Sequence, residues 1–358
     1  MAVLLAGCTL RAGPRLVAPG SESAAWRAPG SYRVAARTLA FDDAASGRRL
    51  VSTVWWPAGR RTPSPLVVQA HGFLGNRRGG TYLARHLASR GMVVIAATHP
   101  TTTRFARGGA KVEDVVRQPA DVRFLIDAML AGDARLPELP PLDVERIAVT
   151  GHSLGGLTAT LAAFHPRLRD PRIAAAVSIA GPMEMFEPRF FRNARVPFLM
   201  IGGSADVVVD YRRNALGTFA RVPDATVALI AGGSHAGFDH AAAGVRRFVS
   251  NPDVFTCWIL RRVLRLDDAV ARVRALATTD EGIDFTDGIR PPCLESPPRD
   301  AMDPAWQQVL TTLAVTAFLE SRFAPEAEAR ERARRYLSVT LPAELPEISV
   351  AAPGRRSA

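Results

Sequence analysis

The segment AVTGHSLGGLTATLAAF, residues 148–164, holds a serine that could act as a nucleophile. Five consecutive residues fit the pattern G-x-S-x-G: Gly151, His152, Ser153, Leu154 and Gly155. The pattern alone is weak, because a chain of this Gly and Ser content matches it by chance in roughly one sequence in ten. Here it follows a predicted strand and opens a stretch with leucines at helical spacing, while Gly151 and Gly155 permit a tight turn. This context predicts a nucleophile elbow that presents the Ser153 hydroxyl above a sheet.

A nucleophilic serine needs a base to take its proton and an acid to orient that base. In an elbow arrangement both follow the serine along the chain, first the acid and then the histidine, each after a later strand. Asp206 ends the candidate strand in FLMIGGSAD, and His235 ends the next one in VALIAGGSH. Asp210 and His240 are the competing acid and base. We favour Asp206 and His235 because they come directly after their strands.

Structural roles remain open for both residues, because an Asp after a Gly-Gly turn is often an Asx-turn and a lone His is more often structural. The required chain order favours catalysis. A hydrolase of this kind also needs an oxyanion hole. His71-Gly72 ends an early strand, so the backbone N–H groups of Phe73 and Leu154 are the predicted pair of donors.

The elements that must position these residues are short apolar runs that alternate with helix-sized segments. The predicted strands begin at Leu50, Leu66, Met92, Arg146, Ile173, Val196 and Thr226. Continuous apolar runs of this length are typical of a parallel sheet that is buried on both faces. The expected fold class is therefore α/β, a mostly parallel central sheet flanked by helices in one domain.

Four parts of the chain differ in character. Residues 1–31 resemble a signal segment followed by a tether, and residues 32–240 together with 303–323 form the predicted α/β core. Residues 241–302 are an insertion after His235, which we expect to cap or wall the site. Residues 324–358 are expected to form a short helix and a frayed tail.

The stretches around these residues resemble α/β-hydrolase serine esterases, and most of all the bacterial proteins similar to dienelactone hydrolase and platelet-activating-factor acetylhydrolase. The matching stretches include QAHGFLGN, RIAVTGHSLGG, VPFLMIGGSAD and GGSHAGF. The resemblance covers roughly residues 66–238 and the helix near residue 318. It implies a Ser-His-Asp hydrolase of carboxylic esters that uses no metal and no organic cofactor.

The expected substrate is a small-molecule ester. Positions at which this sequence departs from the family pattern narrow the range of esters that we expect. Dienelactone hydrolases use a cysteine nucleophile, whereas this chain has Ser153. Phospholipid-like esters and the polyesters of cutinase-like enzymes both stay open. Phe73 could wall an apolar acyl site, whereas Trp55 and Trp56 fit the core better. Perhydrolysis, or thioester or amide cleavage, is a further option, because fold and triad do not fix the acyl acceptor.

The three cysteines give information about the cellular compartment in which the protein works. Leu5-Ala6-Gly7-Cys8 resembles a lipobox, which implies export and a lipid anchor on Cys8, although the match lacks a basic n-region. If the match is accidental, a cytoplasmic protein is expected. Cys257 and Cys293 are then left either as a disulfide or as two small apolar residues. A non-catalytic envelope lipoprotein that binds an apolar ligand is the alternative from outside enzymology.

The formal net charge of +11 raises the question of nucleic acid. The basic residues are scattered, nearly all are arginine, and no basic motif is interleaved with aromatic residues. We therefore expect no nucleic-acid partner, and the oligomeric state is left open.

Overall fold

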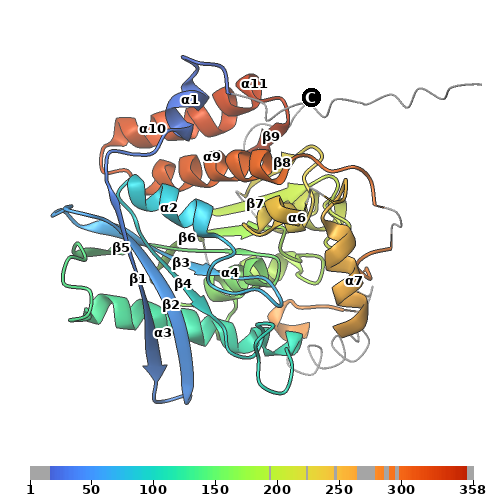
Figure 1. Cartoon of the computed structure of the whole chain (residues 1–358), viewed down its shortest axis with the longest axis horizontal. Helices are drawn as coiled ribbons and strands as arrows, with labels where there is room; N and C mark the ends of the chain where they lie inside the picture. The colour runs from blue at the N-terminus through green and yellow to red at the C-terminus, as the bar shows by residue number, and fades with distance from the viewer. Residues whose placement is uncertain are drawn as a thin grey trace, which may run out of the picture.

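The computed structural model describes residues 17–192, 195–222, 225–245, 248–263, 279–285, 290–294 and 298–352. Within these residues one sheet has the strand order β1-β2-β4-β3-β5-β6-β7-β8-β9 (Figure 1). Its strands are β1 (Val34–Asp43), β2 (Arg48–Pro57), β3 (Ser64–Ala70), β4 (Val93–Thr98), β5 (Leu142–His152), β6 (Ile173–Ile179), β7 (Phe198–Gly203), β8 (Thr226–Ile230) and β9 (Ile348–Ala351). The strands from β4 to β8 in this order pair in parallel, and β1, β2 and β9 pair antiparallel. The predicted mostly parallel sheet is confirmed.

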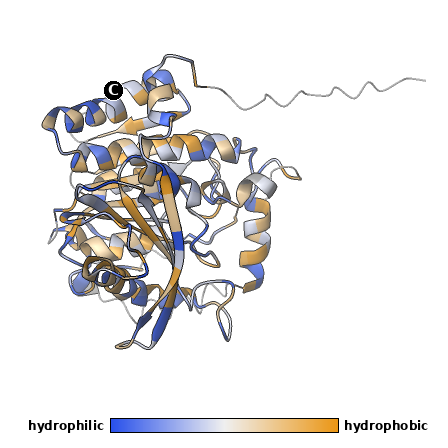
Figure 2. Ribbon diagram, turned by 60° about the vertical axis from the view of Figure 1, so that its left-hand side comes forward, coloured by the Kyte–Doolittle hydropathy of each residue, from blue (hydrophilic) through white to orange (hydrophobic). Residues whose placement is uncertain are grey.

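Helices cover both faces of the sheet (Figure 1). One face packs against α3 (Gln118–Ala131) and α4 (Leu154–Phe164), and the other against α2 (Thr81–Ser89) and α9 (Pro304–Phe323). The central strands are mostly apolar where both of their faces are buried, as the hydropathy colouring indicates (Figure 2). Parallel strands that share one direction bring their carboxyl ends to one edge, where an open sheet of this kind builds its site.

The two ends of the described chain differ from the sequence prediction. The C-terminal segment forms α10 (Ala327–Arg335) and α11 (Leu341–Glu344) and then β9, which pairs with β8, so the expected frayed tail is wrong for this part. The strand has four residues, of which Ile348 is buried and Val350 partly buried, and it is too short for a periodicity signal. The tether predicted up to residue 31 contains α1 (Glu22–Arg27), whose Trp26 stacks on Tyr336 at 4.6 Å between ring centroids.

The insertion supplies α6 (Ala242–Val245) and α7 (Asp253–Val263) beside the carboxyl ends of β7 and β8. Cys257 on α7 forms a disulfide with Cys293. The outer face of α7, at the margin of the molecule in Figure 2, exposes Phe255 and Trp258. Among the described residues no helix is long and apolar enough to cross a membrane.

Candidate active site

Ser153 lies in the turn between β5 and α4 with φ 57° and ψ −120°. A non-glycine residue adopts such angles only under strain, at a cost on the order of 1–3 kcal/mol. The glycines around it permit the turn, because a Cβ on Gly155 would lie 2.2 Å from the carbonyl oxygen of Ala70, and one on Gly151 would lie 2.2 Å from that of Gly155. The Ser153 N–H donates to the carbonyl of Ile179 at 2.8 Å, which fixes the turn to the neighbouring strand.

Three side chains meet at this turn. His235 Nε2 lies 2.8 Å from Ser153 Oγ, and His235 Nδ1 lies 2.8 Å from Asp206 Oδ2. The other carboxylate oxygen of Asp206 accepts the N–H groups of Val208 and Val209, both at 2.8 Å, so the carboxylate cannot rotate freely. Asp206 and His235 are both buried. The structure thus brings together the three residues that the chain order singled out.

The surroundings of His235 favour its protonated form. Burial lowers the pKa of this imidazole, but the charge and hydrogen bond of Asp206 and the charge of Asp253 together raise it above its ordinary value. His152, whose ring centroid lies 4.7 Å from that of His235, has its pKa lowered well below the usual range by burial and by His235. The raised pKa of His235 suits its role as the base that takes a proton from Ser153, and its neighbour His152 stays neutral.

The competing residues lie elsewhere. Asp210 pairs with Arg290, 2.6 Å between Nη1 and Oδ2, and its other oxygen accepts the Arg213 N–H. His240 is exposed, and its N–H donates to the carbonyl of Gly79. Within the described chain, neither side chain forms a hydrogen bond with Ser153.

The turn after β3 carries the predicted oxyanion donor Phe73. A Cβ on Gly72 would lie 3.2 Å from Ser153 Cβ, so this turn touches the elbow. Leu154 is the first residue of α4, and in the described part of the chain neither its N–H nor that of Phe73 has a recorded hydrogen-bond acceptor. Two unpaired donors beside a serine hydroxyl can receive a developing oxyanion.

A buried histidine network that the sequence analysis missed holds this turn. His71 Nε2 accepts the N–H of His99 at 2.9 Å, so Nδ1 carries the hydrogen and donates to the carbonyl of Gly72 at 2.7 Å. Burial and then His99 lower the pKa of His71 to about 3, which keeps it neutral. His99 in turn contacts Asp121, which binds Arg48 through both oxygens at 2.6 Å. No local spacing links these residues, which come from four separate elements.

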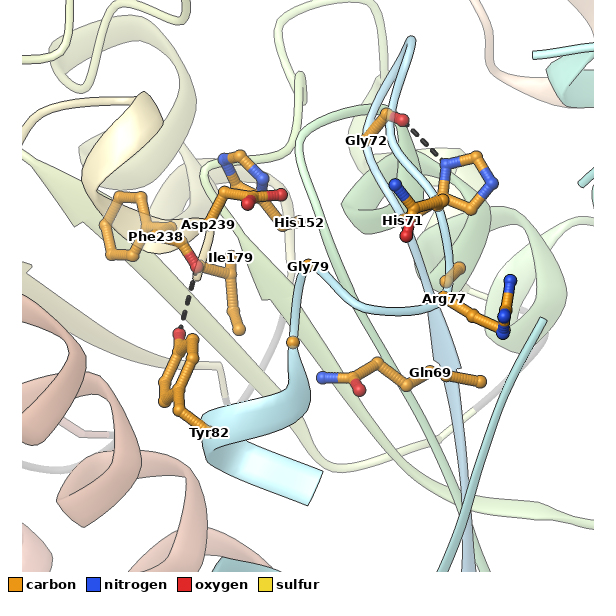
Figure 3. Close-up of a pocket in the computed structure, with 14 residues that line it drawn as sticks. Gln69, His71, Gly72, Arg77, Gly79, Tyr82, His152, Ile179, Phe238 and Asp239 are labelled. Atoms are coloured by element: carbon orange, nitrogen blue, oxygen red, sulfur yellow. Dashed lines mark hydrogen bonds between the residues drawn. The ribbon is translucent and has the colours of Figure 1, made fainter. Parts of the chain in front are cut away.

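A small cavity lies behind the same turn (Figure 3). It is lined by Gln69, His71, His152, Tyr82 and Asp239 among others. Tyr82 donates its hydroxyl hydrogen to the carbonyl of Phe238 at 3.1 Å. Ser153 is not among the residues that line this cavity, which is therefore distinct from the site of the nucleophile.

The remaining sequence predictions have different outcomes. Trp55 and Trp56 are buried in the two hydrophobic clusters on either side of the sheet, in agreement with the core interpretation. Phe73 is half-buried against the core. Cys8 lies outside the described residues. Among the described residues no group of three or more His, Cys, Asp or Glu side chains is arranged to hold a metal ion.

Comparison with known proteins agrees with this geometry. A model of the family described as "PETase: PET hydrolase-like" matches residues 12–267, more than two thirds of the chain. Cutinase est1 of Thermobifida alba is 26% identical over 175 residues, covering 49% of this chain and 53% of the relative. Cutinase 2 of Thermobifida cellulosilytica is 26% identical over 172 residues, covering 48% and 58%.

A fungal protein, hydrolase LUC6 of Fusarium sp., is 31% identical over 164 residues, covering 44% of this chain and 36% of the relative. The chain thus spans about half the length, or less, of these curated relatives. The predicted superfamily of α/β-hydrolase serine esterases is confirmed. The chain belongs to the PET hydrolase-like family of α/β-hydrolases.

Proposed function

We propose that this protein is a serine hydrolase of carboxylic esters. The observation that carries the proposal is the continuous chain of contacts from Asp206 through His235 to Ser153, 2.8 Å at each step. Such a chain both activates a hydroxyl and stabilises the imidazolium that forms when its proton is taken. A role limited to binding an apolar ligand would not require it.

The proposed reaction has two halves. His235 Nε2 takes the Ser153 proton as Oγ attacks the ester carbonyl, and the N–H groups of Phe73 and Leu154 bind the oxyanion. Collapse of the tetrahedral intermediate breaks the ester C–O bond, and His235 returns the proton to the leaving alcohol. A water then attacks the acyl-enzyme by the same route, releasing the acid and restoring Ser153.

The substrate class we propose is an ester with an apolar acyl group, and polyester is the favoured macromolecular form. Two matched relatives are named cutinases and the family description names PET hydrolase, which supports the polyester. Phe73 beside the oxyanion position supports the apolar acyl group. We further propose that residues 241–302 form one wall of the substrate site.

We also propose that the protein is exported. Cys257 and Cys293 pair in the described residues, and disulfides persist in oxidising compartments. The lipobox-like Leu5-Ala6-Gly7-Cys8 supports the same compartment, with Cys8 as the proposed lipid anchor.

The direct test is turnover of p-nitrophenyl esters of increasing acyl length, together with release of soluble acid from an aliphatic and an aromatic polyester film. We expect wild-type turnover and loss of both activities in Ser153→Ala. Asp210→Asn serves as the matched control and should keep near-wild-type turnover. Wild-type protein that is folded but hydrolyses none of these esters would contradict the proposal.

A further inference from the structure

Two buried polar residues at the start of α7, Asn251 and Asp253, connect the insertion to the loops that follow β7 and β8. Both are fully buried, and Asn251 Oδ1 accepts the N–H of Asp253 at 2.9 Å, so their side chains and backbone form one unit. We call Asn251, Asp253 and Cys293 the insertion clamp.

The insertion clamp holds the loop that carries Asp206 on both sides of that residue. Asn251 Nδ2 donates to the carbonyl of Ala205 at 3.2 Å. The N–H of Val207 donates to Asp253 Oδ2 at 3.3 Å, and its carbonyl accepts the N–H of Cys293 at 2.6 Å. The residues immediately before and after Asp206 are therefore tied to the insertion rather than to the sheet alone.

The same carboxylate holds the loop that carries His235. Asp253 Oδ2 accepts the N–H of His235 at 2.9 Å, and Oδ1 accepts the N–H of Ala236 at 2.7 Å. A single buried side chain thus bridges the backbones on which the acid and the base are mounted. Hydrogen bonds to a charged acceptor are about twice as strong as neutral ones, which suits this bridging role.

The charge of Asp253 also acts on the imidazole. The titratable groups that face His235 are Asp206, Asp253 and His152. Asp253 is among the groups that raise the pKa of His235. Burial and the neighbouring Asp206 raise the pKa of Asp253 itself to about 6, while His235 and the N–H groups of Ala236 and His235 lower it.

We propose that Asp253 is a positioning residue of the hydrolase site, which aligns the Asp206 and His235 loops and whose negative charge favours the imidazolium formed when Ser153 loses its proton. This inference rests on the proposed ester hydrolysis at Ser153. On this proposal the insertion aligns the catalytic residues, in addition to forming one wall of the substrate site. The Cys257–Cys293 disulfide supports the clamp, because Cys257 lies one helical turn after Asp253 and Cys293 binds Val207.

The test is the pH profile of kcat/KM for Asp253→Asn, a variant that keeps the shape of the side chain and removes its charge. We expect kcat/KM to fall about tenfold to a hundredfold, the range that misplacement of a reacting group produces. The acidic limb should also move to lower pH, because removing a negative charge makes His235 harder to protonate. A limb that stays in place, or kcat/KM within about twofold of wild type, would overturn the proposal.

Asp170→Asn is the matched control. Asp170 is a buried carboxylate that accepts the backbone N–H of Arg172 at 3.0 Å, but it lies before β6, at the opposite edge of the sheet. This variant should leave the position of the acidic limb unchanged. A limb shift equal to that of Asp253→Asn would overturn the proposal, because the effect would then be common to buried carboxylates.

Two further measurements keep the outcomes separate. If Asp253→Asn does not fold, the double variant Cys257→Ser, Cys293→Ser loosens the clamp while leaving Asp253 in place; slower labelling of Ser153 by a fluorophosphonate supports the proposal, and labelling at the wild-type rate overturns it. Failure of the proposed function is a different result, namely wild-type protein that neither reacts with the fluorophosphonate nor hydrolyses esters.

Discussion

Two histidine–carboxylate pairs lie on either side of Ser153 along the sheet, one after β8 and one after β4. In both, the imidazole Nδ1 and a carboxylate Oδ2 are 2.8 Å apart, and both pairs are buried. His235 turns its Nε2 to Ser153. The other hydrogen-bond partners of the Asp206 carboxylate within the described residues are backbone N–H groups. Asp121, by contrast, also binds the Arg48 guanidinium, and His99 supports the turn through His71.

The difference lies in what surrounds each carboxylate. Burial raises the pKa of Asp121, but His99 and Arg48 together lower it below its ordinary value, so its charge is already compensated. In the part of the chain that the structure describes, no guanidinium pairs with Asp206, and its charge raises the pKa of His235. A histidine–aspartate distance alone therefore does not identify a catalytic pair. A catalytic pair is identified by two further features. A nucleophile lies at the other imidazole nitrogen, and no competing cation is found among the described partners of the carboxylate.

The largest expected effect separates the two histidines. His235→Asn should lower kcat by about 10⁴-fold or more, because Ser153 loses its base. His99→Asn should lower kcat by less than about tenfold, since it acts only through the Gly72 turn. Steady-state kinetics on a p-nitrophenyl ester checks both, and equal losses would erase the distinction between the pairs.

The second comparison concerns the carboxylates. Asp206→Asn should lower kcat by about 10³–10⁴-fold and move the acidic limb of the pH profile to lower pH, because the imidazole loses the charge that favours its protonated form. Asp121→Asn should keep kcat within about tenfold of wild type. The measurement is the pH dependence of kcat for both variants, and an unmoved limb in Asp206→Asn would contradict the assigned role.

The third effect is on stability. Asp121→Asn leaves the nearly buried Arg48 without its carboxylate, and breaking such a pair costs about 3–5 kcal/mol. We expect the free energy of unfolding, measured by chemical denaturation, to fall by about 3 kcal/mol. A loss below about 1 kcal/mol would mean that Arg48 finds other partners.

The smallest effect is the pH dependence of stability, which should have opposite signs for the two pairs. Because the pKa of Asp121 is lowered on folding, its contribution is present above its unfolded pKa, near 4, and is lost as the pH falls through the folded value. The pKa of His235 is raised, so its contribution is present below about pH 6.5 and is lost as the pH rises through the folded value. Denaturation of wild type, Asp121→Asn and His235→Asn across pH 3–8 should show differences on the order of 1 kcal/mol. Slopes of the same sign for both pairs would contradict the assignment.

Much of the sheet and of the site could be predicted because local signals determine them. The strands from β3 to β8 each contain an apolar run, and Ser153, Asp206 and His235 follow three of them in chain order. The strand β1 and the strand β9 were missed because edge strands carry short or mixed patterns. Strand β2 was predicted but its antiparallel direction was not, since periodicity does not encode direction.

The buried polar contacts were outside the reach of sequence reasoning for a different reason. Asp253 lies in the SNPDVF stretch, which read as a turn, and its role depends on two loops that are 46 and 18 residues away. Asp121 is separated from Arg48 by 73 residues. Such contacts are set by the tertiary fold, and a single sequence gives no signal for them.

The most direct test of the central claim is fluorophosphonate labelling with peptide mapping on wild type, His235→Asn and His99→Asn. The account predicts one label on the peptide that contains Ser153 in wild type and in His99→Asn, and no label in His235→Asn over the same time. Labelling at another serine, or none in folded wild-type protein, would contradict the assignment of Ser153 as the nucleophile.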